Sequence, residues 1–454
     1  MLRQTRLGFS LCLSLGLLGG TTQANTLDAD QALMRDAFHY TYPLYKLSDY
    51  RWIALNDATA RTHTQLNLFA HSREITSPED RWANGPIVDA LYSTAWIDLA
   101  HGPVTLHTPD TGKRYYVLTL IDFYSNTFFY AGTRATGNAS QRLWLVGPDW
   151  KGEVPADVSL VRAPTNDVYV NLRVLVDGKA DLAAAHRVQD GFQIVPAIAA
   201  SATAPARPQP MRDDAERYLQ VVNQMLELDP PPVEQRQMLQ DFAKVGVCGK
   251  ACSWDKLPES QKQAWRATLP KLQAAFMQTY LKISAANSWI DYSPPGSLLG
   301  TDKQRDFQLR AYSLALGMGI LGMRREEANY WITFRDEQGQ PLRGDARYRL
   351  RLPAGGIPVQ AFWSISLYTA GKDGQFLYAN PLKRHHLGSR TGLTANPDGS
   401  IDIIIQPTPP SEMNSNWLPT PVDGQEFELF VRAYIPGAGV LSGNFKMPPV
   451  QRVN

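Results

Sequence analysis

Carboxylates, a histidine and aromatic side chains in the first third of the chain could together perform acid–base chemistry. His71 and Arg73 are two residues apart, so in an extended segment they share one face, and His71 is the best single candidate for a proton carrier. Asp89 and Asp122 could act with His71 as general acid and base, directly or through a bound cation. The same group contains Tyr92, Trp96, Asp98, Tyr124 and Arg134, of which Tyr92, Tyr124 and Arg134 are candidate ligand contacts.

Each of these residues also has a structural interpretation. Asp122 and Arg134 could cap turns or form ion pairs, the aromatic side chains could fill a core, and His71 could make a structural hydrogen bond. The residue types alone leave both interpretations open.

A second candidate group lies near the C-terminus. Lys383 and Arg384 precede His385 and His386, and neighbouring residues of a strand point to opposite faces, so this histidine pair is not expected to bind one metal ion. A solvated turn is the favoured interpretation, and the functional alternative is an anion site in which Lys383, Arg384 and Arg390 hold a carboxylate or phosphate. The aromatic residues Trp363, Tyr368 and Trp417 could form an apolar wall for a ligand.

Two short motifs match known signatures, but their context argues against those functions. The glycine pattern 317–322 spells a dinucleotide fingerprint, yet it follows a segment with helical rather than strand spacing, which indicates close helix packing. Ser253 and Lys256 spell a penicillin-recognition motif without its partner motifs, so Ser253 is interpreted as a helix N-cap. The sequence predicts no metal site and no cofactor.

Short β-rich runs on either side of a helical segment predict the fold class. After a helix expected over 29–46, strands are expected at 104–108, 114–121, 127–131, 143–146, 158–163 and 168–176, and again at 330–335, 347–351, 360–368, 401–406 and 426–433. Residues 213–228, 232–244, 259–286 and 302–322 have helical spacing and follow a linker rich in Ala and Pro. The predicted organisation is a β-domain at 25–195, a linker and helical insert at 196–328, and a second β-domain at 329–454.

The first residues predict export. Arg3 and Arg6 precede an apolar run at 7–18, and a small-residue pattern ends at Ala24, as in a signal peptide over 1–24. We therefore expect cleavage near Ala24, a Gram-negative periplasmic location, and a mature chain without a membrane span. In that oxidising compartment Cys248 and Cys252, the two cysteines that remain, are expected to form a local disulfide.

Composition excludes one class of partner. The chain is 44% hydrophobic and 19% charged, with a formal net charge of +2. Nucleic-acid binding calls for clustered Lys and Arg in a basic domain, so no nucleic-acid partner is expected. Nothing in the sequence indicates an oligomeric state.

Several motifs, in order along the chain, resemble a pair of bacterial domains. The segments 67–73, 89–99, 102–104, 114–118, 132–137, 147–150 and 162–165 are similar to the domain of unknown function 1254. The segments 362–368, 380–384, 398–403, 416–419 and 431–436 are similar to its usual partner, the domain of unknown function 1214. This resemblance implies two jelly-roll-like β-sandwich domains with helices packed between them, in a protein that is mainly β, and it implies no known reaction.

The chain departs from the family pattern at two positions beside Asp89. Ile87 and Ala90 stand where the pattern usually has Asn and Thr. If those polar side chains form a site in relatives, this chain has lost part of that site.

Two functions from different classes follow from these observations. The first is a periplasmic protein that binds a small organic or glycan-like ligand between its two β-domains. The alternative is a hydrolase of unknown substrate that uses His71 with Asp89 or Asp122.

Overall fold

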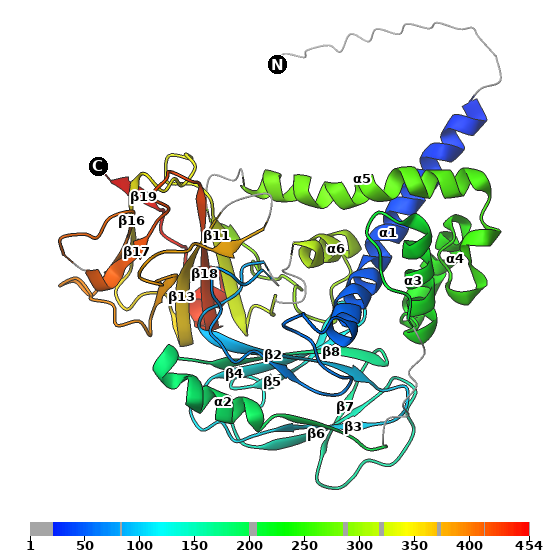
Figure 1. The fold of residues 1–454 in the computed structure, drawn as a ribbon, viewed down its shortest axis with the longest axis horizontal. Coiled ribbons are helices and arrows are strands. Elements are labelled where there is room, and N and C mark those ends of the chain that lie inside the picture. The colour runs from blue at the N-terminus through cyan, green and yellow to red at the C-terminus, as the bar shows by residue number, and fades with distance from the viewer. Residues whose placement is uncertain are drawn as a thin grey trace, which may run out of the picture.

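The fold is that of a computed structural model, which describes residues 21–81, 84–198, 207–284, 289–316, 322–369, 374–412 and 414–453 (Figure 1). The helices are α1 (Thr21–Asn56), α2 (Leu182–Asp190), α3 (Ala215–Leu228), α4 (Arg236–Phe242), α5 (Glu259–Ser284), α6 (Phe307–Ala315) and α8 (Ala438–Leu441). The strands of the first half are β1 (Ala70–His71), β2 (Ala90–Asp98), β3 (Val104–Thr108), β4 (Tyr116–Asp122), β5 (Thr127–Gly132), β6 (Gln141–Val146), β7 (Ser159–Arg162), β8 (Asp167–Leu175) and β9 (Gln193–Pro196). Those of the second half are β10 (Ile290–Asp291), β11 (Ala328–Thr333), β12 (Arg347–Leu352), β13 (Val359–Thr369), β14 (Phe376–Leu377), β15 (His386–Gly388), β16 (Ile401–Gln406), β17 (Trp417–Pro419), β18 (Phe427–Pro436) and β19 (Gln451–Val453).

The strands form four sheets, numbered here in the order in which their faces pack. Sheet I has the order β7-β6-β3-β9, and sheet II has the order β1-β2-β8-β4-β5. Sheet III has the order β10-β11-β18-β13-β14, and β15 also pairs with β13. Sheet IV has the order β17-β16-β12-β19. Nearly all neighbouring strands are antiparallel, and the exceptions are the pairs β6–β7 and β16–β17.

Alternating side chains hold sheets I and II together. Leu91, Ala95 and Ile97 of β2 share one apolar core with Leu106 of β3 and Leu145 of β6. This pairing of two sheets over a common core makes the first half a β-sandwich. Its expected β-rich character is confirmed, with helices added outside the sheets.

The other face of sheet II is covered by two different partners. Tyr92 of β2 and Tyr115 pack in one core with Phe362 and Tyr434 of sheet III. Trp96, at the far end of β2, packs against the helices instead. Sheet III then uses its second face, including Trp363, to form a fourth core with sheet IV. The two halves of the chain therefore meet through a buried interface.

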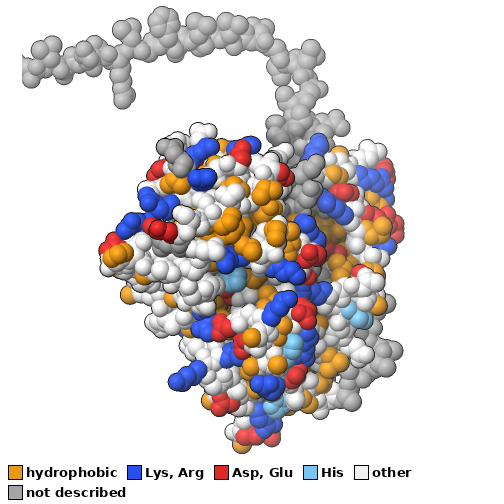
Figure 2. Space-filling view, turned by 60° about the vertical axis from the view of Figure 1, so that its left-hand side comes forward, with side chains coloured by type: hydrophobic (Ala, Val, Ile, Leu, Met, Phe, Trp, Pro, Cys, Tyr) orange, Lys and Arg blue, Asp and Glu red, His pale blue; other side chains and the backbone are white. Residues whose placement is uncertain are grey.

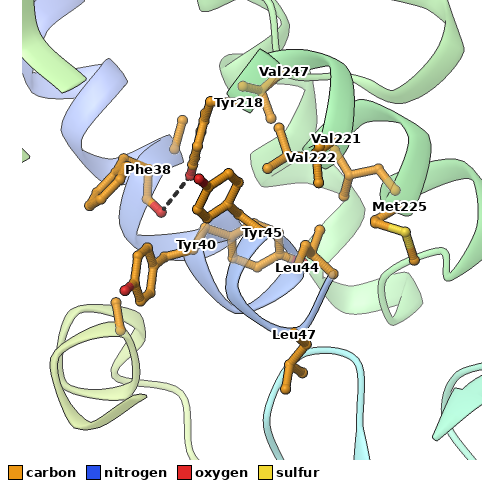
Figure 3. Close-up of a cluster of buried hydrophobic side chains, with 14 of the residues drawn as sticks. Phe38, Tyr40, Leu44, Tyr45, Leu47, Tyr218, Val221, Val222, Met225 and Val247 are labelled. Carbon is orange, nitrogen blue, oxygen red and sulfur yellow. Dashed lines mark hydrogen bonds between the residues drawn. The ribbon is translucent and has the colours of Figure 1, made fainter. Parts of the chain in front are cut away.

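Helices from both ends of the sequence form one cluster beside the sheets. Phe38 and Leu44 of α1 lie in the same core as Tyr218 and Val222 of α3, and the hydroxyl of Tyr218 donates to the Phe38 carbonyl at 3.3 Å (Figure 3). Helices α5 and α6 also contact α1. The entry helix expected over 29–46 is α1, which runs to Asn56 and packs with helices of the insert.

Local features of the insert can be compared with the sequence predictions. Cys248 and Cys252 form a disulfide with Cα atoms 5.4 Å apart, as predicted for the two cysteines of an exported chain. Ser253 is the N-cap residue of the 3-10 turn Trp254–Lys256, but its side chain makes no capping hydrogen bond. Residues 1–20 of the expected signal peptide, 199–206 of the linker and 317–321 of the glycine motif lie outside the described residues.

Within the described ranges, no helix combines the length and the apolar character that a membrane span requires.

Candidate functional site

A cleft of about 1030 Å³ lies between the first sandwich and sheet III. One wall comes from β1 with the segment that follows it, from Val88 and Asp89 before β2, and from the chain after β8. The opposite wall comes from the second half of the chain and includes Lys383, His386 and Arg390. The cleft therefore brings together His71, Asp89 and Arg390, three of the residues that the sequence selected.

Asp89 lies where the two walls meet. Its Oδ2 accepts a hydrogen bond of 2.6 Å from Ser364 Oγ of β13, and its Oδ1 lies 3.3 Å from Nε2 of His386. The Asp89 side chain is 10% exposed and that of His386 is 27% exposed, and both residues line the cleft. A carboxylate next to a histidine is a combination that acid–base catalysis uses.

His71 has different partners. Its Nδ1 lies 2.8 Å from Ser93 Oγ, which also accepts a hydrogen bond of 2.9 Å from Gln189. Burial, together with the nearby charge of Arg73, lowers the pKa of His71 to about 4. The imidazole is therefore neutral near pH 7 and can contact a ligand as a hydrogen-bonding group rather than as a cation.

An ion pair joins the two walls at the edge of the cleft. Arg390 Nε donates to Asp177 Oδ1 at 2.5 Å, and Arg390 Nη2 donates to Asp177 Oδ2. Asp177 is itself supported, because its backbone N–H donates to Asp181, which pairs with Arg114. Arg390 is thus occupied by a protein carboxylate, in a contact that spans the two walls.

The cleft carries both signs of charge. Its lining contains five Lys or Arg residues and five carboxylates, namely Arg61, Arg73, Lys179, Lys383 and Arg390 with Glu74, Glu79, Asp80, Asp89 and Asp177. Basic and acidic side chains are also interspersed on the face of the molecule shown in Figure 2. In the part of the chain that the structure describes, no group of three or more His, Cys, Asp or Glu side chains is arranged to hold a metal ion.

Asp122 and Tyr124 lie apart from the cleft. Asp122 Oδ1 accepts the backbone N–H groups of Tyr124 and Asn126 at 2.9 and 2.8 Å, which closes the turn between β4 and β5. Burial raises the pKa of Asp122 despite these bonds. The hydroxyl of Tyr124 donates to the Asp229 carbonyl. The structure therefore does not bring Asp122 to His71, and it shows Asp122 in the structural role of a turn cap.

Three more selected residues lie in the interface between sheets II and III. Tyr92 and Tyr368 are 2% and 0% exposed, and the Tyr368 hydroxyl donates to the Pro86 carbonyl at 2.8 Å. Arg134 donates from Nε to the buried Glu327 at 2.6 Å. These residues join the two halves of the chain and do not line the cleft.

The last three selected residues belong to the second sandwich. Trp363 and Trp417 are buried, and the Trp417 indole donates to the Gln406 carbonyl at 2.8 Å. Arg384 donates to the carbonyls of Asn414 and Trp417. The expected aromatic wall of Trp363, Tyr368 and Trp417 is therefore not part of the cleft, because all three side chains fill cores.

Family comparisons agree with the order of the motifs. Residues 66–196 match the model of a family described as a protein of unknown function, DUF1254. Residues 327–438 match a second family with the same description, DUF1214. The chain carries both domains. No curated protein was found to match it.

Solved structures with similar folds carry no description of activity. The crystal structure of the VPA0106 protein from Vibrio parahaemolyticus has a TM-score of 0.69 and 24% identity, and the match covers 94% of this chain and 100% of that chain. A putative uncharacterized protein from Burkholderia cenocepacia has a TM-score of 0.47 and 13% identity over 95% of each chain. The first of these similarities supports the overall fold and says nothing of function.

Sequence reasoning missed Ser364, Ser93 and Gln189, and it favoured a solvated turn for His386. Ser364 and His386 belong to the DUF1214 domain and reach Asp89 of the DUF1254 domain only through the packing of sheets II and III. They are 275 and 297 residues from Asp89, so no local spacing could have indicated the contact.

Proposed function

We propose that this protein binds a small polar organic ligand in the cleft between its DUF1254 and DUF1214 domains. The single observation that carries this proposal is the contact of Asp89 with His386 across a cleft of about 1030 Å³. Concave sites at domain boundaries with a few convergent polar groups are where small molecules usually bind.

The lining supports a ligand with many hydrogen-bonding groups. Asp89, His386 and His71 offer acceptors and donors, and Lys179 and Lys383 are exposed cations whose side chains form no ion pair with another described residue. Lys383 is held at a φ of 52°, a conformation that non-glycine residues adopt at a cost in free energy and that often occurs at functional sites. A hydroxylated acid or a short saccharide bound mainly through hydrogen bonds fits this lining.

A second candidate function is hydrolysis, because Asp89 could orient His386 as a general base. In that reaction His386 would remove a proton from an attacking water, and Asp89 would stabilise the imidazolium that forms. Of the two carboxylates that the sequence offered as partners of His71, Asp89 lines the cleft, whereas Asp122 closes a turn elsewhere and does not enter this proposal.

The binding proposal is tested by thermal-shift screening of hydroxy acids, amino acids, monosaccharides and short oligosaccharides. We expect a ligand that raises the midpoint of the wild type but not of Asp89→Asn or His386→Gln. Asp110→Asn is a matched control, because Asp110 is an exposed turn carboxylate outside the cleft. Equal shifts in the wild type and both cleft variants, or a soaked ligand found away from the cleft, would refute the proposal.

The hydrolysis candidate is tested with chromogenic esters of the acids that bind. Turnover by the wild type whose kcat is lost in His386→Gln, even at substrate concentrations that compensate for weaker binding, would support it. If the protein binds the acids but does not hydrolyse their esters, the hydrolysis candidate is refuted and the binding proposal stands.

We also propose that the protein is exported to the periplasm of a Gram-negative bacterium, on the strength of Arg3, Arg6 and the apolar run that follows. N-terminal sequencing of the protein from the periplasmic fraction should begin near Asn25. An intact N-terminus in the cytoplasmic fraction would contradict export.

A further inference from the structure

A chain of hydrogen bonds runs from α2 through β2 to His71 in the cleft. His71 of β1 and Ser93 of β2 lie directly opposite each other in the antiparallel register, and His71 Nδ1 lies 2.8 Å from Ser93 Oγ. Gln189 of α2, which is 0% exposed, donates from Nε2 to the same Ser93 oxygen at 2.9 Å. Of these three residues, only His71 lines the cleft. A ligand in the cleft can therefore contact His71 but not the two residues that support it.

The orientation of the Gln189 amide is determined by two backbone carbonyls. Its Nε2 lies 3.2 Å from the carbonyl oxygens of both Ser72 and Tyr92. Carbonyl oxygens only accept hydrogen bonds, so the atom between them must be the NH2 group. Gln189 Oε1 is buried and finds no partner among the described residues. The reverse orientation would set that oxygen against both carbonyls and leave the NH2 group without an acceptor, so it is less favourable.

The amide orientation decides the direction of the hydrogen bond between Ser93 and His71. The Gln189 NH2 group cannot accept, so the Ser93 oxygen accepts from it. Among the described residues, His71 Nδ1 is the one other hydrogen-bond contact of this hydroxyl, and Ser93 is 1% exposed. The hydroxyl hydrogen therefore goes to Nδ1. A hydrogen on Nδ1 would leave the Ser93 hydroxyl hydrogen buried without an acceptor, which costs free energy.

The hydrogen of the neutral His71 imidazole is therefore on Nε2. Phe69 stacks on the ring with centroids 5.5 Å apart, which also holds the plane of the imidazole. Nε2 makes no hydrogen bond to another described residue, and it is not one of the buried polar atoms that lack a partner, so it retains accessible surface. His71 thus offers the cleft an N–H donor in a fixed tautomer.

The charges near His71 favour an acceptor with negative charge. Arg73, which also lines the cleft, forms an ion pair with Asp190. The charge of Arg73 nevertheless acts on the imidazole more strongly than that of Asp190, and with burial it lowers the pKa of His71. The same positive potential that disfavours an imidazolium stabilises an anionic oxygen beside Nε2.

We propose that His71 determines ligand specificity by donating a hydrogen bond from Nε2 to a carboxylate oxygen, and that Ser93 and Gln189 are positioning residues that fix the required tautomer. The sequence suggested His71 as a proton carrier, whereas in this role it stays neutral and recognises an acid. The contact with a ligand rests on the proposed function, but the tautomer does not, so the two parts are tested separately.

The tautomer is measured by long-range 1H–15N NMR of the histidine rings of the 15N-labelled full chain near pH 7. We expect His71 to carry its hydrogen on Nε2, like His186, whose Nε2 lies 2.7 Å from the Arg73 carbonyl and must donate to it. The exposed His101 should show an exchanging mixture of tautomers. The His71 signals are those absent from His71→Gln. A hydrogen on Nδ1 of His71, or the same mixture as His101, would overturn the proposal.

Two variants test the role of Ser93. Ser93→Ala should shift the His71 signals toward the pattern of His101, because Nδ1 loses its donor. Ser293→Ala removes another buried hydroxyl, which contacts no histidine, and should leave the His71 signals unchanged. An unchanged tautomer in folded Ser93→Ala would overturn the positioning role. The wild-type spectrum decides the tautomer even if this variant does not fold.

The ligand contact is tested by isothermal titration with gluconate and with glucitol, which has an alcohol in place of the carboxylate. Ionic strength is kept constant with chloride. We expect the wild type and His101→Gln to bind gluconate more tightly than glucitol. His71→Phe keeps a ring but loses the N–H, so gluconate binding should weaken about tenfold while glucitol binding is unchanged.

The outcomes separate this inference from the proposed function. Equal gluconate affinity in the wild type and His71→Phe, or no gluconate binding by the wild type, would overturn the contact with a carboxylate. The proposed function would still stand if another ligand requires Asp89 and His386. If no ligand depends on those two residues, the proposed function and the ligand contact both fail, and the NMR result alone stands.

Discussion

Asp89 Oδ1 and His386 Nε2 lie 3.3 Å apart, although the two residues belong to different domains. The carboxylate also accepts a hydrogen bond from Ser364, so both of its oxygens are directed to the DUF1214 domain. This contact makes Asp89 part of the domain interface as well as of the cleft.

Substitution of Asp89 should separate its structural role from its role in binding. We expect Asp89→Asn to lower the thermal midpoint by only a few degrees, because the amide oxygen can still accept from Ser364. Asp89→Leu should cost roughly 1–3 kcal/mol, because the Ser364 hydroxyl then remains buried without an acceptor. Urea unfolding measures both effects, and an equally large loss in the Asn variant would show that the charge itself stabilises the interface.

The low pKa of His71, about 4, predicts how stability depends on pH. An unfolded histidine has a pKa of about 6.5. Between these values His71 binds more protons in the unfolded chain than in the folded chain. Its contribution therefore makes the free energy of unfolding rise as the pH increases from 4 to 6.5, and fall as the pH decreases through that range. His71→Gln should reduce that slope in urea unfolding, whereas His101→Gln, at an exposed position, should not. If His71→Gln leaves the pH dependence of the free energy of unfolding unchanged, the pKa of His71 is not lowered in the folded protein.

The ion pair between Arg390 and Asp177 should contribute little to global stability. The two side chains are 45% and 40% exposed, and exposed pairs are worth up to about 1 kcal/mol. A double-mutant cycle with Arg390→Gln and Asp177→Asn measures the coupling. A value several times larger would mean that this pair, rather than the buried interface of sheets II and III, holds the domains together.

Ile87 should tolerate a polar side chain poorly. The family pattern suggested that Ile87→Asn with Ala90→Thr could restore a site, but Ile87 is 1% exposed in the core between the domains. We expect Ile87→Asn to lower the free energy of unfolding by roughly 2–4 kcal/mol, because apolar area is lost and an amide is buried. A wild-type midpoint together with stronger ligand binding would instead support the restored site.

The cysteine pair should be oxidised and of modest energetic value. Thiol titration of the denatured, unreduced chain from Asn25 onward should find almost no free thiol, because Cys248 and Cys252 are bonded. The closed loop is short, so Cys248→Ser with Cys252→Ser should cost roughly 2 kcal/mol. Two titratable thiols would rule out the bond.

Amino-acid patterns were sufficient for elements whose local signal is strong. The run at 104–108 coincides with β3, and the run at 401–406 coincides with β16. The prediction of α3 was two residues too long at its start, because Asp214 is the N-cap and accepts from the Arg217 N–H. Regular elements depend on side-chain spacing and turn residues, which the sequence displays directly.

Strand β2 was not predicted, for a physical reason. All nine of its residues are buried, because one face of sheet II packs on sheet I and the other on helices and sheet III. A strand covered on both faces loses the alternation of polar and apolar residues by which strands are recognised.

The sequence by itself determined the domain order, the β-rich class with helices, the cysteine pair and the presence of Asp89 and His71 among the candidates. Only the tertiary structure placed Asp122 in a turn, buried Trp363 and Trp417, and brought Ser364 and His386 to Asp89. Hydrogen bonds across a domain interface depend on how two cores pack together, and residues nearly 300 positions apart leave no local pattern that records it.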